Sequence, residues 1–224
     1  MKTNRHLSRQ RRRAFTLVEM LVVMAVIAVL AAILFPAFGA IKKSGTLKKT
    51  RAQLGKVVMA VEAYKQQHGH YPPDNPDNPV VNQLYYELGG TRLNGTEYQT
   101  ESGQGNMPAG NFSSFFGGGR VTGFVNVSRG GGDEAQSAKN HLIGIPPSDY
   151  LLVTNGVPGV VLGTTIKGPI MLNDTNNAAI NPFRYVSTAA SNNPGHFDLW
   201  VDIIVGGKTN RISNWSEKAQ TVAY

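Results

Sequence analysis

The chain contains no cysteine among its 224 residues. A disulfide framework, a thiol nucleophile and a cysteine-ligated metal site are therefore excluded. The G-x-S-x-G elbow, the H-E-x-x-H zinc helix and the G-x-x-x-x-G-K-[ST] phosphate loop are also missing. Glycine triplets at 117–119 and 130–132 are typical of flexible turns. The sequence therefore predicts a structural or binding protein and no enzyme.

Acidic residues are scarce in the first third of the chain, where only Glu19 precedes Glu62. The first 14 residues hold no acid and 6 basic residues: Lys2, Arg5, Arg9, Arg11, Arg12 and Arg13. Without those 6, 16 basic residues face 14 acidic ones, so most of the formal charge of +8 belongs to this segment. A basic terminal segment of this kind indicates targeting. We therefore expect no nucleic-acid partner.

A long apolar run follows, from Phe15 to Phe35, in which only Thr16 and Glu19 are polar. At ~1.5 Å rise per residue, about 20 such residues span the ~30 Å hydrocarbon core of a bilayer. The run predicts a membrane-spanning helix over residues 15–38. A carboxylate inside such a helix costs a few kcal/mol. Glu19 is therefore a functional candidate.

The residues Ala14-Phe15-Thr16-Leu17-Val18-Glu19 resemble the processing site of type IV pilins and of the pseudopilins of type II secretion. The resemblance implies that residues 1–14 are a leader, cut between Ala14 and Phe15 by a prepilin peptidase that also methylates the new N-terminus. It also implies that Glu19 guides filament assembly by pairing with the amine of Phe15 on a neighbouring subunit. Ala14 departs from the family, which usually has Gly there.

Pro36 follows the apolar run. A proline inside a helix removes one hydrogen bond and kinks the axis, and the family resemblance places a bend or local melting at this point. The alternative is a helix that stops at the membrane surface. Beyond it, an apolar stripe at helical spacing predicts an amphipathic helix over 39–70: Leu47, Leu54, Val58 and Val61, with Val57 and Tyr64 beside them. We expect one interrupted helix from about Phe15 to about His68, ended by Gly69 and Tyr71-Pro72-Pro73.

A second basic cluster lies on this helix: Lys42, Lys43, Lys48, Lys49, Arg51 and Lys56. This cluster carries as many basic residues as the leader, so charge does not decide which end of the membrane helix lies in the cytoplasm. The expected orientation, with the N-terminus in the cytoplasm, depends on the resemblance alone. We interpret the cluster as a solvated face close to the membrane; contact with DNA or anionic lipid is the alternative.

Residues 71–224 are expected to form a globular head with a loop-rich insertion at 74–140. Val80–Leu88 is a candidate short helix, and Phe112, Phe115 and Phe116 are expected to anchor a loop rather than to form a binding tip. His68 and His70 are interpreted as polar helix-end residues rather than metal ligands. Short β-prone runs separated by Asn, Gly and Pro follow: Tyr150–Thr154, Gly159–Thr165, Ile170–Leu172, Phe183–Val186 and Phe197–Val205. The predicted fold class is α+β, a long N-terminal helix packed on a small antiparallel sheet.

Three further segments resemble the major pseudopilin of type II secretion: VEAYKQQHGHYPP at 61–73, NPFRYV followed by PGHFDLW at 181–200, and ISNW at 212–215. That family has an acidic calcium-binding loop before the last of these, where this chain has Lys208 and Arg211. Calcium requires six to eight oxygen ligands. We therefore predict no cofactor, with calcium at Asp198 and Asp202 as the alternative.

The resemblance implies a structural subunit of the type II secretion pseudopilus. Its expected partners are the prepilin peptidase/methyltransferase, copies of itself and other pseudopilins, an inner-membrane assembly platform and the lipid bilayer. The expected location is the inner membrane, with a single span and the C-terminal domain in the periplasm or, in the filament, outside the cell. Three alternatives remain: a type IV pilus subunit, a membrane-tethered binding module that never polymerises, and a secreted protein whose signal peptide ends at Gly39.

Overall fold

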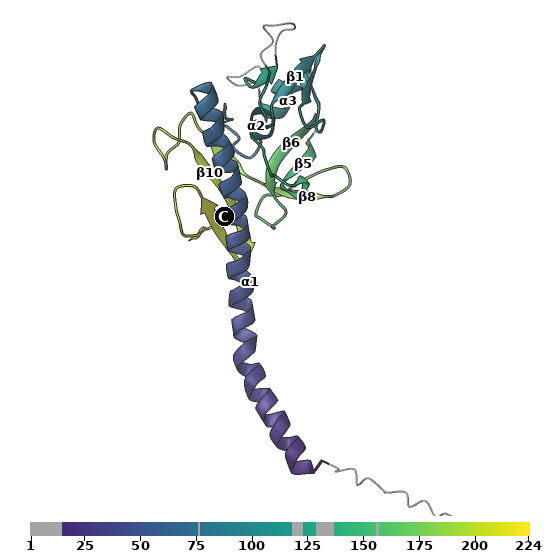
Figure 1. Ribbon diagram of the computed structural model, residues 1–224, viewed down its shortest axis with the longest axis vertical. Coiled ribbons are helices and arrows are strands. Elements are labelled where there is room, and N and C mark those ends of the chain that lie inside the picture. Colours follow the sequence, from purple (N-terminus) through teal and green to yellow (C-terminus); the bar gives the residue numbers. More distant parts are fainter. Residues whose placement is uncertain (1–14, 76, 118–122, 129–136, 156) are drawn as a thin grey trace, which may run out of the picture. The chain divides into compact units, whose positions relative to one another are not determined.

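The computed structural model describes residues 15–75, 77–117, 123–128, 137–155 and 157–224 (Figure 1). The predicted leader, including Ala14, and the glycine triplet at 130–132 lie outside the described residues. The chain divides into two units, Met1–Lys42 and Lys43–Tyr224.

The first element is a single long helix, α1, from Leu17 to His68. α1 continues through Pro36, so the expected interruption of the helix is absent; the bend or local melting of this helix in assembled filaments stays a prediction. Proline removes only one backbone donor, and the other residues around it keep theirs. The predicted end is confirmed: Gly69 has φ 78°, and its amide donates to the Lys65 carbonyl oxygen at 2.8 Å. Glycine occupies this left-handed position without a Cβ clash.

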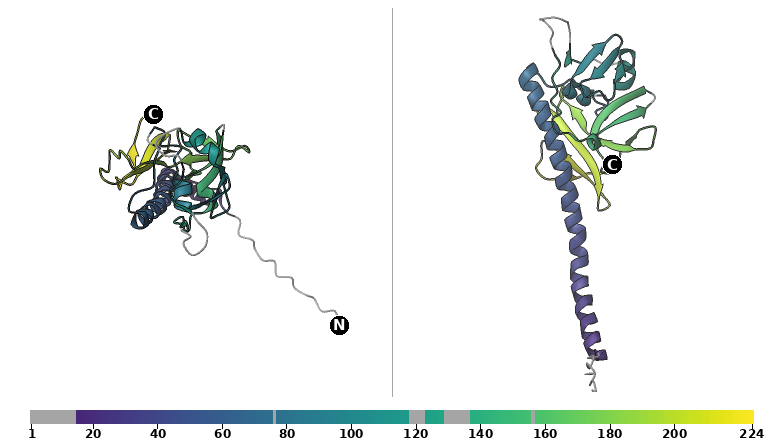
Figure 2. Two further views of the ribbon diagram at one scale, coloured as in Figure 1. Left: turned by 90° about the horizontal axis from the view of Figure 1, so that it is seen from above. Right: turned by 45° about the vertical axis from the view of Figure 1, so that its right-hand side comes forward.

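Within the second unit, the predicted apolar stripe of α1 packs on the core, with Leu47 and Val58 partly buried and the rest buried. Leu54, Val57, Val61 and Tyr64 are each at most 3% exposed. They share one hydrophobic cluster with the apolar face of strand β10, which carries Leu199 and other buried residues. Figure 2 shows the strands of this region alongside the second part of α1. Burial of a large apolar side chain contributes about 1.5–3 kcal/mol, so this stripe fixes the helix on the head.

The described strands form three four-stranded sheets. The first has the order β3-β2-β1-β4, with β1 at Thr91–Asn94, β2 at Glu97–Thr100, β3 at Met107–Pro108 and β4 at Val127–Ser128. The second has the order β5-β6-β8-β7, with β5 at Tyr150–Asn155, β6 at Val157–Thr164, β7 at Leu172–Asn173 and β8 at Ala179–Pro182. The third has the order β12-β11-β10-β9, with β9 at Arg184–Val186, β10 at Asp198–Val205, β11 at Lys208–Ser213 and β12 at Gln220–Thr221.

The α+β class is confirmed, with a long N-terminal helix followed by sheets that are antiparallel except for the β1–β4 pair. All five β-prone runs overlap a strand, although Ile170–Leu172 shares only Leu172 with β7, and these strands belong to two different sheets and not to one. The segment expected to be loop-rich carries strands β1–β4 and the short helices α2 (Leu84–Gly89) and α3 (Phe112–Phe116). Two 3-10 turns at Ala109–Asn111 and Pro147–Asp149 complete the described elements.

A buried carboxylate connects α1, α2 and the segment before β4. Glu87 of α2 is 0% exposed and accepts a hydrogen bond from the Tyr64 hydroxyl at 3.0 Å. Its two oxygens also accept from the amides of Val125 at 2.8 Å and Asn126 at 3.0 Å. Burial raises the pKa of Glu87 and outweighs these donors, which lower it. The three donors explain how the head accommodates a polar group in its core.

Candidate functional site

The first part of α1 exposes a continuous apolar surface. Leu17 is 81% exposed and Ile33 66%, and the large apolar side chains between them are exposed as well. Its most apolar 18-residue window has a mean hydropathy of 2.9, and none of that window is buried. Among the described residues, this helix alone is long and apolar enough to cross a membrane. Such a surface needs either lipid or other helices to cover it.

Glu19 sits in the first turn of α1 and forms a capping box with Thr16. The Thr16 amide and hydroxyl both donate to Glu19 Oε2 at 2.8 Å. In return the Glu19 amide donates to Thr16 Oγ1 at 3.2 Å. A T-x-x-E sequence directly before an apolar helix is the usual signature of this motif. This pattern, Thr16 followed three residues later by Glu19, is present in the sequence but was not predicted above to form a cap.

The two carboxylates proposed as calcium ligands lie on β10 but serve different contacts. Asp198 accepts the amides of Asn192 and Asn193 at 2.9 Å each, and also the side-chain amide of Asn192. Asp202 is four residues further along the strand, which at ~3.3 Å per residue places it about 13 Å away. Two carboxylates that share a calcium ion each bind it at ~2.3–2.6 Å. This pair therefore does not fit one calcium ion.

Asp202 is 0% exposed and is enclosed by donors from the other strands of its sheet. Arg211 of β11 binds it with two bonds, Nε to Oδ1 at 2.8 Å and Nη2 to Oδ2 at 3.0 Å. The hydroxyl of Tyr224, which follows β12, donates to Oδ2 at 2.6 Å. Arg184 Nη1 of β9 lies 4.0 Å from the same oxygen. The carboxylate of Asp202 thus links side chains from β9, from β11 and from the segment after β12.

Residues 9–35 match a family model described as a prokaryotic N-terminal methylation motif. This match covers 27 of the 224 residues and supports a type IV pilin-like protein. No curated protein and no solved structure matches it. The motif implies processing by a prepilin peptidase and assembly with other pilin-like subunits. Together with the apolar first part of α1, it indicates that this pilin-like protein is anchored in a membrane.

The segments at 61–73, 181–200 and 212–215, which resemble the major pseudopilin, meet in one region of the head. The Tyr185 hydroxyl of the NPFRYV segment donates to the Pro72 carbonyl oxygen at 2.9 Å. The Tyr71 ring lies 5.1 Å from that of Phe197 in an edge contact. Asn214 of the ISNW segment accepts from the Leu199 amide at 2.9 Å. Segments more than 100 residues apart along the chain therefore contact one another near the end of α1.

The other residues singled out in the sequence are structural. Phe112, Phe115 and Phe116 are at most 8% exposed in the core cluster, so the prediction that they anchor this region is confirmed. His68 ends α1, with its ring stacked on Tyr64 at 4.2 Å between centroids, and His70 is exposed. In the described part of the chain, no group of three or more His, Asp or Glu is arranged to hold a metal.

Three of the basic residues on α1 contact the head. Arg51 donates to the Ser216 carbonyl oxygen at 2.9 Å, and Lys56 donates to that of Gly144 at 3.0 Å. Lys65 donates to the Tyr71 hydroxyl at 3.0 Å. The contacts of Arg51 and Lys56 favour a structural role for this part of the basic cluster, while Lys65 lies outside that cluster.

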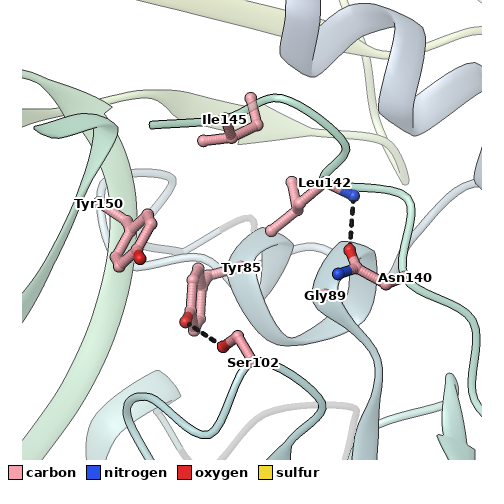
Figure 3. Close-up of a pocket in the computed structure, with 7 residues that line it drawn as sticks. All are labelled: Tyr85, Gly89, Ser102, Asn140, Leu142, Ile145 and Tyr150. Carbon is pink, nitrogen blue, oxygen red and sulfur yellow. Dashed lines mark hydrogen bonds between the residues drawn. The ribbon is translucent and has the colours of Figure 1, made fainter. Parts of the chain in front are cut away.

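A small cavity of about 90 Å³ lies between α2, β5 and the segment before β5 (Figure 3). The rings of Tyr85 and Tyr150 line it 5.1 Å apart, and the Tyr85 hydroxyl bonds Ser102 Oγ at 3.1 Å. Asn140 turns its side-chain oxygen to the Leu142 amide at 2.8 Å. Ligand pockets usually measure about 300–1,000 Å³, so this cavity is too small for an organic ligand.

Proposed function

We propose that this chain is a pseudopilin, a subunit of a type II secretion pseudopilus. In this proposal the prepilin peptidase cuts between Ala14 and Phe15 and methylates Phe15. The mature helix then holds the subunit in the inner membrane by a single span over residues 15–38, with residues 39–70 and the head 71–224 on the periplasmic side. An assembly platform in that membrane adds it to copies of itself and to other pseudopilins.

The exposed apolar first part of α1, which carries a carboxylate near its start, is the observation that carries the proposal. An ordinary membrane anchor gains nothing from Glu19, because charged groups in hydrocarbon are costly. In a bundle of such helices, the carboxylate would meet the Phe15 amine of a neighbouring subunit. Opposite charges interact far more strongly in such a low-dielectric bundle than in water. An unpaired charge there is strongly destabilising, so the pairing would fix the axial register of neighbouring subunits.

The choice of a pseudopilin over a type IV pilus subunit is supported by the head. The segments at 61–73, 181–200 and 212–215 resemble the major pseudopilin, and they pack together. The chain also lacks cysteine, so it has no disulfide at its C-terminal end.

Site-specific crosslinking tests whether the helix polymerises. Because the chain has no native cysteine, the double variant Val22→Cys, Val29→Cys, at positions that are 54% and 61% exposed, gives unambiguous products and lets each subunit bond to two neighbours. In cells that make the secretion machinery, oxidation should produce ladders of several subunits. The same cysteines in a Glu19→Ala background are the matched control and should give monomers or at most dimers. Monomers with native Glu19 would instead favour a membrane-tethered binding module that never polymerises.

A further inference from the structure

We infer that Asp202, Arg211 and Tyr224 form a metal-free clamp that closes the C-terminal sheet, so that the head folds and stays folded without calcium. This clamp is independent of the proposed assembly function, because it concerns only the stability of residues 43–224. Its basis is the set of contacts around one fully buried carboxylate.

The hairpin geometry places the two charged residues face to face. Asp202 and Arg211 are direct cross-strand partners in the β10–β11 pairing. The hairpin turns at Gly206 and Gly207, which have φ of 62° and 72°. Two successive residues with positive φ form the tight turn that matches the twist of β-hairpins. The register is therefore fixed by the turn, and the ion pair follows from the register.

The charge balance around Asp202 is unfavourable for a divalent cation. Two guanidinium groups, from Arg184 and Arg211, surround one carboxylate, so the cluster carries one excess positive charge. Both oxygens of Asp202 already accept from Arg211, and Oδ2 also accepts from Tyr224. A calcium ion would have to displace these donors and meet repulsion from the two cations. The Arg211 guanidinium thus supplies the positive charge that a metal would otherwise supply.

The clamp also holds the segment that follows β12. Tyr224 is 67% exposed as a residue, yet its hydroxyl reaches the buried Oδ2 of Asp202. The guanidinium of Arg211 lies 5.7 Å from the Trp200 ring centroid, so one side of the pair is covered by an aromatic ring. Side chains from β9, β11 and the segment after β12 therefore converge on Asp202 of β10.

Thermal unfolding of the full-length protein in detergent tests the clamp directly. The melting midpoint should agree within about 1 °C between millimolar calcium chloride and EGTA, and Arg211→Gln should lower it by at least about 4 °C in both. Lys208→Gln, on the same strand and exposed, is the matched control and should change it little. Tyr224→Phe removes one hydrogen bond only and should give a smaller loss, which keeps the test valid if Arg211→Gln does not fold.

A double-mutant cycle separates a specific pair from general disruption. Asp202→Asn combined with Arg211→Gln should lower the midpoint by clearly less than the two single changes added together, because it removes both members of this pair and leaves only the charge of Arg184. A calcium-induced rise of several degrees in the native protein would overturn the inference. Strict additivity of the two changes, or a Tyr224→Phe midpoint equal to that of the native protein, would overturn it as well.

Discussion

Glu19 accepts both the amide and the hydroxyl of Thr16 at 2.8 Å, so the carboxylate is turned toward the start of α1. Cleavage before Phe15 would create an ammonium group only one residue from Thr16. The cap therefore holds the carboxylate close to the end of the helix where that amine would appear. An N-terminal carboxylate also complements the helix dipole, by about 0.3–1 kcal/mol.

Replacement of Glu19 is the first prediction. Glu19→Ala should leave membrane insertion intact, because it removes a charge from an apolar segment, and should abolish incorporation into filaments. Met20→Leu, a conservative change at the next position, is the control and should assemble normally. Fractionation measures insertion, and shearing followed by immunoblotting measures filaments. Filament yields at the native level in Glu19→Ala would disprove the assembly role.

The histidines around Tyr64 predict a loss of stability at mildly acidic pH. Burial, followed by the neighbouring charge of His70, lowers the pKa of His68 below 6.5. Burial, followed by the charges of His68 and Lys139, lowers the pKa of His141. The unfolded chain then binds protons that the folded state does not, so the free energy of unfolding falls as pH drops below about 6.5 toward the lowered values.

Urea unfolding at pH 7.5 and pH 5.5 measures this effect. Glu87 acts in the opposite direction, because burial raises its pKa and protonation then favours the folded state. The comparison is therefore made with the double variant His68→Gln, His141→Gln, which keeps Glu87. The native protein should lose more stability between the two pH values than the double variant does. Equal losses in the two proteins would show that these histidines are not responsible.

Replacement of glycine by alanine is expected to have opposite effects on stability at Gly163 and at Gly45. At Gly163 in β6, a Cβ would meet the carbonyl oxygen of Asn181 on the paired strand β8. Gly163→Ala should therefore destabilise the head by about 1–3 kcal/mol. At Gly45 in α1, a Cβ meets nothing within 4 Å, so Gly45→Ala should stabilise the helix by about 0.5–1 kcal/mol. Chemical denaturation of both variants checks the pair; equal effects would mean that the β6–β8 contact is not as close as described.

Much of the architecture could be predicted from local sequence. The apolar run, the stripe over Leu54–Tyr64 and the glycine at 69 specify α1 and its end, because helical periodicity and termination are encoded within a few residues. The strands β5, β6 and β10 follow from runs rich in β-branched residues. Pro36 misled the interpretation because one missing hydrogen bond does not decide the course of a 52-residue helix.

The remaining features depend on contacts between distant segments. Strand β1 pairs in parallel with β4, with Thr91 beside Val127. No local sequence pattern predicts the pairing of two such short strands. Asp202 was considered as a metal ligand because the family resemblance places a calcium-binding loop in this region, and its pairing with Arg211 was not predicted. The signal was nevertheless available: Asp202 and Arg211 lie four residues before Gly206 and four after Gly207, which makes them partners in a two-residue hairpin. The contributions of Arg184 and Tyr224 were not predictable without the fold.

Mass spectrometry of the N-terminal peptide tests the central claim most directly. The protein is purified from the membranes of cells that contain a prepilin peptidase, and the matched control is the same chain from cells that lack it. Our account predicts a mature chain that begins at Phe15 and carries one methyl group on its amine, and an uncleaved chain in the control. A mature chain that begins at Ala40, as after a secretory signal peptide, or one that keeps residues 1–14 in both cells, would contradict it.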